Sequence, residues 1–307
     1  MKGTIANPSE TDEDVSILLR KVLGSCNINF LFGAGANGKA FPSFSGFKKT
    51  IAKMNKLNLP GKNIETALQT CTDDNTRQVI LKSFVDEYNS FNGYQLDNPS
   101  IQNLHSLLSA TYKTVCKAEN RHADSKRVNV FTLNYDRIVE ETLETSGYFS
   151  YVLNAETKTA LPFNIVGYDT EKRSFVPTFA IYKLHGSVKT NRTLSASGIV
   201  FPGQDKLGSV ISEFYETLFA MKGELLKKNA ALFVIGYSWS DAHINGVISD
   251  AIDNGLTVIF PKYSEHSEVD KELQNKVICL PPALHADGDD PHDTTKTLAE
   301  LFEKAIS

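Results

Sequence analysis

Short apolar segments alternate with segments of helical periodicity along this chain, and that alternation restricts the possible folds more than any other feature. The apolar segments are 28–32, 127–133, 179–184, 231–235, 256–260 and 277–280. Residues at helical spacing, such as Ile244, Ile248 and Ala251, separate two of them. Strands that alternate with helices form a mostly parallel sheet with helices on both faces. The sequence therefore predicts an α/β protein with a Rossmann-like, doubly wound, mostly parallel sheet.

The region between the first two predicted strands has helical periodicity throughout. Three stripes of apolar residues, beginning at Ile64, Ile80 and Ile101, recur at spacings of three and four residues. No apolar segment of strand type interrupts them. A chain of 307 residues can bury one large core. We therefore expect a single domain over 1–307 with a helical insertion over 45–126.

Composition disfavours several classes of protein. The formal net charge is −4 at pH 7, so we expect no direct binding of nucleic acid. No apolar run reaches the roughly 18 to 20 residues of a membrane helix, and the polar N-terminal segment lacks the apolar centre of a signal peptide. The four cysteines are scattered without a CxxC pair, which indicates reduced thiols and disfavours a zinc ribbon. We expect a cytoplasmic protein without membrane association or bound metal.

Polar or glycine-rich residues directly follow four of the predicted strands. The segments are GAGAN after Phe32, NYD after Leu133, HGS after Leu184 and GYSWSD after Ile235. The carboxyl ends of parallel strands meet at one edge of a sheet, where the ligands of open α/β sheets bind. The four segments together therefore predict one binding site at that edge.

GAGAN and GYSWSD each admit two interpretations. The glycines of GAGAN let backbone amides approach a diphosphate, but the GxGxxG spacing is incomplete and a plain tight turn has the same composition. In GYSWSD, Ser238 and Asp241 fit an S-x-x-D capping box for the next helix. A glycine and a serine at a strand end also suit a ribose or a phosphate. His243, in the first helical turn, is equally compatible with a surface position.

NYD and HGS contain the side chains best suited to catalysis. Asp136 is placed to cap the helix that begins near Arg137. Asn134 lies two residues earlier, at the strand end, where its amide has one acceptor and two donors with which to hold a water molecule. His185 is either a structural residue or, if a second polar group converges on it, a general base near neutral pH.

Taken in order, the motifs resemble those of the sirtuins. They are GAG, Pro42-Ser43-Phe44, T-x-N-Y-D at 132–136, L-H-G-S at 184–187 and G-Y-S-x-x-D-x-H-I-N at 236–245. Lysine deacylases of that family have Asn-Ile-Asp where this chain has Asn-Tyr-Asp. The tyrosine form, together with FPGQDK at 201–206, is more similar to bacterial sirtuin-like proteins of antiphage defence, which hydrolyse NAD⁺. The resemblance covers about 28–260, with little of it in the helical insertion.

The resemblance implies roles for individual residues, with NAD⁺ as the substrate. Asn134 and His185 correspond to the catalytic pair. The implied contacts to NAD⁺ are Gly33, Ala34, Gly35 and Asn37 at the diphosphate, Phe44 and Asp136 near the nicotinamide, and Gly236, Tyr237 and Ser238 at the adenosine. Asp241 is a further candidate contact, and its role and that of His243 stay open. Asn37 stands where serine is commoner and Ser45 where deacylases carry arginine, so the diphosphate and loop contacts differ from the family pattern.

The resemblance also predicts an activity. Deacylating sirtuins carry two cysteine pairs in a zinc module, and this chain has no such pairs. We therefore expect an NAD⁺ glycohydrolase that depletes NAD⁺ in antiphage defence by abortive infection. We also expect a homo-oligomer, regulated by a protein partner such as a HerA-type ATPase or a phage-sensing protein. The alternatives are a zinc-free deacylase or ADP-ribosyltransferase, and a non-catalytic module that senses NAD⁺ or ADP-ribose.

Overall fold

The described part of the chain is built on one parallel sheet. The computed structural model describes residues 12–59, 64–91, 93–119, 121, 125–146, 150–153, 179–195, 215–264, 267–281 and 294–306. The sheet has seven strands in the order β3-β4-β2-β1-β5-β6-β7, and all of its pairings are parallel. The strands are β1 (Asn27–Phe32), β2 (Val128–Thr132), β3 (Ser150–Leu153), β4 (Phe179–Lys183), β5 (Ala230–Ile235), β6 (Thr257–Pro261) and β7 (Ile278–Leu280). The prediction of a doubly wound α/β protein is confirmed.

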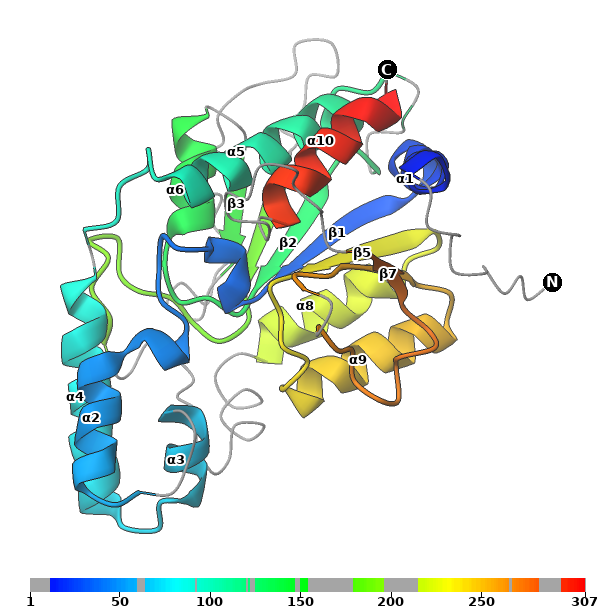
Figure 1. The fold of residues 1–307 in the computed structure, drawn as a ribbon. Coiled ribbons are helices and arrows are strands. Elements are labelled where there is room, and N and C mark those ends of the chain that lie inside the picture. Colours follow the sequence, from blue (N-terminus) through cyan, green and yellow to red (C-terminus); the bar gives the residue numbers. More distant parts are fainter. Residues whose placement is uncertain are drawn as a thin grey trace.

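Helices cover both faces of the sheet (Figure 1). On one face lie α1 (Asp12–Ser25), α5 (Pro99–Thr111), α6 (Ile138–Thr145) and α10 (Thr294–Ile306), and on the other lie α8 (Tyr215–Leu225) and α9 (Ala242–Asp253). Each face has its own apolar core, and β5 contributes to both, with Phe233 in the first and Leu232 and Val234 in the second. Because both faces are buried, the strand sequence is apolar without alternation.

The strand order brings the four polar segments to neighbouring positions. From the central β1 the chain first builds β2, β3 and β4 on one side and then returns to build β5, β6 and β7 on the other. The carboxyl ends are level, since Phe32 pairs with both Thr132 and Ile235, and Thr132 pairs with Lys183. The change of winding direction beside β1 is the place where open α/β sheets bind ligands.

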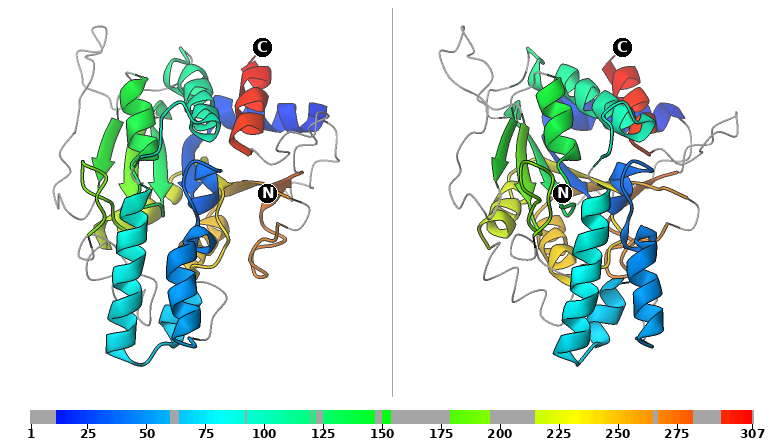
Figure 2. Two further views of the ribbon diagram at one scale, coloured as in Figure 1. Left: turned by 60° about the vertical axis from the view of Figure 1, so that its left-hand side comes forward. Right: turned by 90° about the vertical axis from the view of Figure 1, so that its left-hand side faces the viewer.

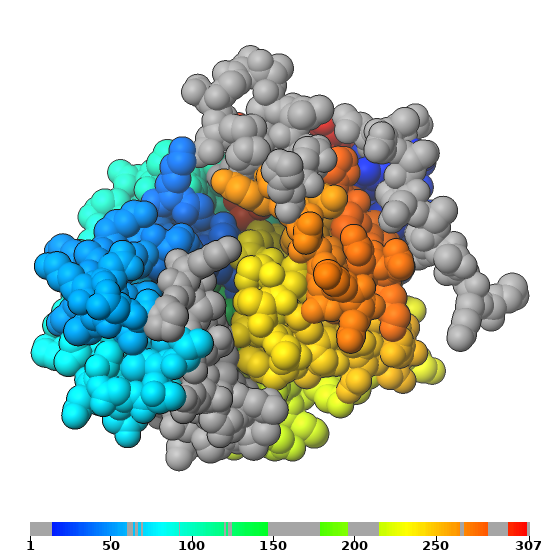
Figure 3. All heavy atoms as spheres, turned by 60° about the horizontal axis from the view of Figure 1, so that its bottom comes forward, coloured from blue at the N-terminus to red at the C-terminus, as the bar shows by residue number. Residues whose placement is uncertain are grey.

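The connection from β1 to β2 is helical. It contains the 3₁₀ turns η1 (Ala34–Asn37) and η2 (Phe44–Gly46), the helices α2 (Lys48–Lys56), α3 (Ile64–Thr70), α4 (Asp74–Ser90) and α5, and the π-helical turn η3 (Tyr112–Cys116). Figures 1 and 2 show α2, α3 and α4 projecting beyond the carboxyl edge of the sheet, whereas α5 packs beside α10 over its face. Figure 3 views that end of the molecule, with the blue and cyan helices on one side and the yellow-to-orange residues after β5 on the other. The region predicted as one insertion thus contains two structurally different parts.

Some sequence predictions fall elsewhere. The edge strand β3 was not predicted, because its four residues form no distinct apolar run within an aromatic-rich region. The segment GIVFPG at 198–203, whose sequence is compatible with a short strand, and the FPGQDK segment at 201–206 lie outside the described residues. None of the four cysteines forms a disulfide within the described part of the chain. Within the described ranges, every helix is too short or too polar to cross a lipid bilayer.

Candidate functional site at the carboxyl edge of the sheet

The segments that follow β1, β2, β4 and β5 surround one cavity of about 570 Å³. That volume lies within the range of roughly 300 to 1,000 Å³ that is usual for small-molecule sites. Every residue predicted for catalysis or cofactor binding lines it. These residues are Gly33, Ala34, Gly35, Asn37, Phe44, Asn134, Asp136, His185, Gly236, Tyr237, Ser238 and Asp241. The sequence motifs therefore converge in space.

The floor of the cavity is a backbone-to-backbone contact between the loops after β1 and β5. The amide of Gly35 donates to the carbonyl of Gly236 over 2.9 Å. Gly236 has φ +64°, and a Cβ built on it would lie 2.1 Å from the Ala36 nitrogen. A Cβ on Gly33 would likewise meet the Gly236 carbonyl at 2.4 Å. Glycine is required at these positions because any side chain would push the two loops apart.

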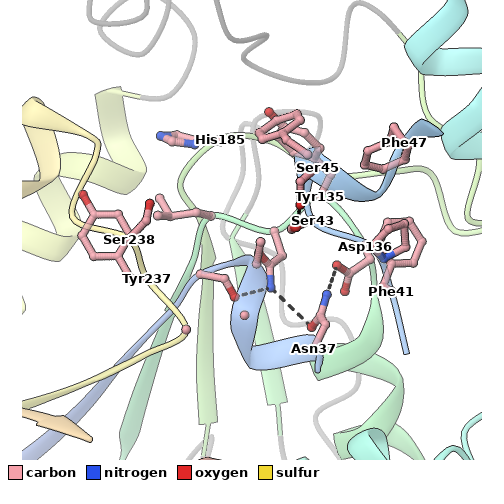
Figure 4. Close-up of a pocket in the computed structure, with 18 of the residues that line it drawn as sticks. Asn37, Phe41, Ser43, Ser45, Phe47, Tyr135, Asp136, His185, Tyr237 and Ser238 are labelled. Atoms are coloured by element: carbon pink, nitrogen blue, oxygen red, sulfur yellow. Dashed lines mark hydrogen bonds between the residues drawn. The ribbon is translucent and has the colours of Figure 1, made fainter. Parts of the chain in front are cut away.

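A chain of hydrogen bonds holds the side chain of Asn134 (Figure 4). Its Nδ2 donates to the carbonyl of Gly33 over 3.0 Å and to Oδ1 of Asn37 over 3.3 Å. Asn37 in turn donates through its Nδ2 to Oδ2 of Asp136 over 2.6 Å. All three side chains are buried.

Acceptors at both ends of this chain fix the orientation of the amides. The carbonyl of Gly33 can only accept, so the Asn134 atom that faces it must be Nδ2. An ionised Asp136 can also only accept, so Asn37 must turn its own Nδ2 that way and present Oδ1 to Asn134. Oδ1 of Asn134 has no hydrogen-bond partner among the described residues. That atom is therefore left to accept a hydrogen bond from a ligand or a water molecule.

Asp136 joins this chain to the helix behind it. Its Oδ1 accepts from the amide of Ile138, the first residue of α6, over 3.0 Å, so the predicted capping hydrogen bond is present although Arg137 occupies the N-cap position. Burial raises the pKa of the Asp136 carboxyl, and the nearby Lys183 ammonium partly opposes that shift. Lys183 donates to the Asp136 carbonyl over 2.5 Å and pairs with Glu140 over 3.3 Å, with both side chains of the ion pair 1% exposed.

The segment after β4 places His185 on the other side of the cavity (Figure 4). The amides of Leu184 and Val188 donate to the carbonyls of Thr132 and Tyr135, over 2.9 and 2.8 Å, which ties this segment to the one that carries Asn134. His185 is buried, and its Nε2 lies 3.1 Å from Nε2 of His243 at the start of α9. A second polar group therefore converges on His185, and it comes from α9.

Of the two interpretations of GYSWSD, the capping box formed by Ser238 and Asp241 is wrong. Asp241 itself occupies the N-cap position of α9, and its side chain makes no capping hydrogen bond. Ser238 instead contacts the hydroxyl of Ser240 over 2.9 Å. The helix starts three residues later than a capping box on Ser238 requires, and the Asp241 carboxylate lies with the ring nitrogens of His185 and His243 within 4.8 Å of one another.

Aromatic side chains from the helical connection close one end of the cavity. Phe44 and Phe47 follow β1, and Phe84 and Tyr88 come from α4. Phe47 packs against Phe84 and Tyr88 with ring centroids 4.9 and 6.0 Å apart. Such a wall excludes water and offers flat apolar surfaces to a ring.

Sequence reasoning missed two parts of this site. It included only Phe44 of the aromatic wall. Phe84 and Tyr88 belong to a helical stripe that looks like ordinary core, and Phe47 lies between η2 and α2 without a distinctive pattern. It also missed Lys183, whose signal was a lone charge in the otherwise apolar strand FAIYK.

The fold and the position of the cavity define a Rossmann-type α/β protein with a ligand site where the winding of the sheet reverses. Residues 128–279 match the family model of the SIR2-like domain. A Sir2 homologue in complex with NAD has a similar fold, with a TM-score of 0.50 and 12% identity over 95% of each chain. A structure from work on the mechanism and regulation of Sir2 enzymes gives 0.49 and 12%, over 95% of this chain and 96% of that one. No curated protein matches the sequence.

Proposed function

We propose that this protein cleaves the bond between nicotinamide and ribose in NAD⁺ and releases nicotinamide and ADP-ribose. The observation that carries the proposal is the oriented amide of Asn134, which offers a free Oδ1 in the cavity that His185 also lines. The SIR2-like domain match and the NAD complex of a Sir2 homologue support NAD⁺ as the ligand.

The residues present fit such a ligand. The loops after β1 and β5 form a glycine backbone floor that suits a diphosphate, because no side chain stands between the backbone and the ligand. The aromatic wall suits a nicotinamide or an adenine ring.

The chemistry requires little proton transfer to the leaving group. Nicotinamide in NAD⁺ is a cationic pyridinium that takes the electron pair of the broken C–N bond and leaves as a neutral ring. The ribose then resembles an oxocarbenium ion, as in glycoside cleavage. Asn134 would orient a water molecule or the ribose hydroxyls through Oδ1. His185 would accept the proton that this water loses as its oxygen bonds to the anomeric carbon.

The test is a product assay with NAD⁺ alone and with NAD⁺ plus an acetylated peptide. Nicotinamide and free ADP-ribose in both reactions support a glycohydrolase. Product that depends on peptide would instead identify a deacylase, and ADP-ribose retained on protein a transferase. Binding of NAD⁺ without turnover would identify a sensing module.

Variants at the two proposed catalytic residues sharpen the assay. Asn134→Ala and His185→Ala should each lose NAD⁺ cleavage by on the order of 100-fold or more while still folding. Asn254→Ala and His105→Ala, at positions outside the cavity, serve as matched controls with expected wild-type turnover. Near-normal turnover by either cavity variant contradicts the assignment.

The biological setting follows from the sequence resemblance. The protein is a cytoplasmic effector that depletes NAD⁺ when a phage infects the cell, and it works as a homo-oligomer beside a HerA-type ATPase or a phage-sensing protein. Constitutive NAD⁺ loss would kill the host, so activity must be held off in the resting cell. Cellular NAD⁺ measured during infection, with the wild type and with Asn134→Ala, tests this setting: NAD⁺ should fall only with the wild type.

A further inference from the structure

Two imidazoles and one carboxylate meet beside the cavity. His185 follows β4, whereas Asp241 and His243 stand at the start of α9, so the set joins two separate segments. The two Nε2 atoms are 3.1 Å apart, and one ligand atom from each of the three side chains lies within 4.8 Å of the others. His185 and Asp241 are buried and His243 is half-buried.

The spacing of the two imidazoles matches that of zinc ligands. Two nitrogens bound to zinc at about 2.05 Å in a tetrahedral site stand about 3.3 Å apart, close to the separation found here. The carboxylate oxygen lies no more than 4.8 Å from either nitrogen and would have to move by roughly 1.5 Å, because tetrahedral ligands all stand about 3.3 Å apart.

We propose that His185, His243 and Asp241 bind one Zn²⁺ ion, and that the bound ion inhibits the enzyme by occupying the ring nitrogen of His185. The inhibitory part rests on the proposed function, whereas the binding part does not. Two nitrogens and one carboxylate favour zinc over magnesium or calcium, which prefer oxygen ligands alone. Among the described residues no cysteine or further histidine joins this group, so water would take the fourth coordination position of the ion.

Zinc binding would replace the hydrogen bond between the rings. One Nε2 must carry a hydrogen to donate to the other, and zinc needs the lone pair of both atoms. The donor ring therefore moves its proton from Nε2 to Nδ1 by exchange with solvent, and both rings stay neutral. In that state His185 has no free Nε2 lone pair to accept a proton from an attacking water.

The experiment measures metal binding without NAD⁺. Zn²⁺ is titrated by calorimetry into protein freed of metal with a chelator, and Co²⁺ is titrated in parallel because its absorption reports tetrahedral coordination. We expect a 1:1 complex, and His243→Asn and Asp241→Asn should each weaken it by at least about 10-fold. His105→Asn, on α5 and outside the cluster, is the matched control and should bind as the wild type does.

Two outcomes overturn the site. An equal affinity in wild type and His243→Asn would show that the ion binds elsewhere, and the half-exposed His243 tolerates substitution well enough for that variant to fold. An absence of saturable binding by the folded wild type would remove the site altogether.

A second arm tests inhibition. NAD⁺ cleavage by the wild type should fall with zinc occupancy and return on addition of a chelator. Zinc that binds with full occupancy and leaves turnover unchanged contradicts the regulatory part alone. A protein that binds zinc and never cleaves NAD⁺ contradicts the proposed function and leaves the metal site standing.

Discussion

Replacement of Asp136 by asparagine should disturb the donor-to-acceptor order of the hydrogen bonds that orient Asn134. The new amide keeps the cap of α6 by accepting from Ile138 with its oxygen, so its NH₂ group faces Nδ2 of Asn37 across the present 2.6 Å. Asn37 must then flip, and the same conflict passes to Asn134. If Asn134 also flips, its oxygen faces the carbonyl of Gly33 at 3.0 Å. One repulsive contact is therefore unavoidable.

The size of the effect follows from that contact. A buried polar pair of the wrong polarity costs about 1 to 3 kcal/mol. Because 1.36 kcal/mol corresponds to a tenfold change in rate, turnover should fall roughly 10- to 100-fold if the cost is borne by the orientation of Asn134. Stability should change little, since the substitution also removes a carboxylate whose pKa is raised by burial and which is therefore costly to ionise in the fold.

The assay compares steady-state NAD⁺ cleavage with thermal unfolding. Asp73→Asn is the matched control, because Asp73 caps α4 by accepting from Thr76 and lies outside the cavity. The decisive variant is the exchange of Asn37→Asp with Asp136→Asn. The carboxylate at 37 then accepts from both neighbours, so the orientation of Asn134 and most of the turnover should return. Full activity in the single Asp136→Asn variant, or no recovery in the exchanged pair, would refute the reasoning.

Four further predictions concern the same region. The chain of hydrogen bonds through Asn37 needs an ionised Asp136 as its acceptor, so turnover should fall on acidification. The midpoint should lie above the ordinary carboxyl pKa of about 4, because burial raises the pKa of Asp136. The free energy of unfolding should change with pH in the opposite direction. Relative to Asp136→Asn, the wild type should be more stable below the ordinary carboxyl pKa of about 4. That additional stability should disappear as the pH rises through the raised pKa of Asp136, as urea unfolding at several pH values will show. Gly236→Ala should destabilise the fold by more than the roughly 1 to 3 kcal/mol of backbone strain, whereas Gly255→Ala, with φ +100° and open space around it, should show the strain alone in thermal unfolding. Lys183→Met should destabilise by about 3 to 5 kcal/mol in urea because it leaves Glu140 buried and unpaired, and addition of Glu140→Gln should recover most of that loss.

The sequence predicts the sheet well because its strands are buried on both faces. Segments such as AALFVI are apolar without interruption, and the turn residues that follow them mark the strand ends. An edge strand such as β3, only four residues long, carries no comparable signal. The helices were found through their apolar stripes, but a stripe does not tell whether a helix covers the sheet, as α5 does, or projects beyond it, as α4 does.

The site shows the same division between local and non-local information. Asn134 and His185 were found because each directly follows a strand, and strand ends converge in a parallel sheet. The pairing of Asn37 with Asp136 joins residues 99 positions apart, and the pairing of His185 with His243 joins residues 58 apart. Such pairs depend on loop paths and side-chain directions that no local pattern encodes. The wrong capping box at Ser238 has the same origin, since three residues of shift in a helix start leave the composition unchanged.

The separation of the aromatic wall from the strand-end residues has a consequence for how this protein can change over time. The groups that would act on the bond lie in short segments fixed by the sheet, whereas the four rings of the aromatic wall come from one stretch of the chain, η2 to α4. A single recombination event that exchanged that stretch could alter which molecule fits while leaving Asn134 and His185 in place. Selectivity for the ligand can therefore change through that one stretch while the residues proposed to carry the reaction stay the same.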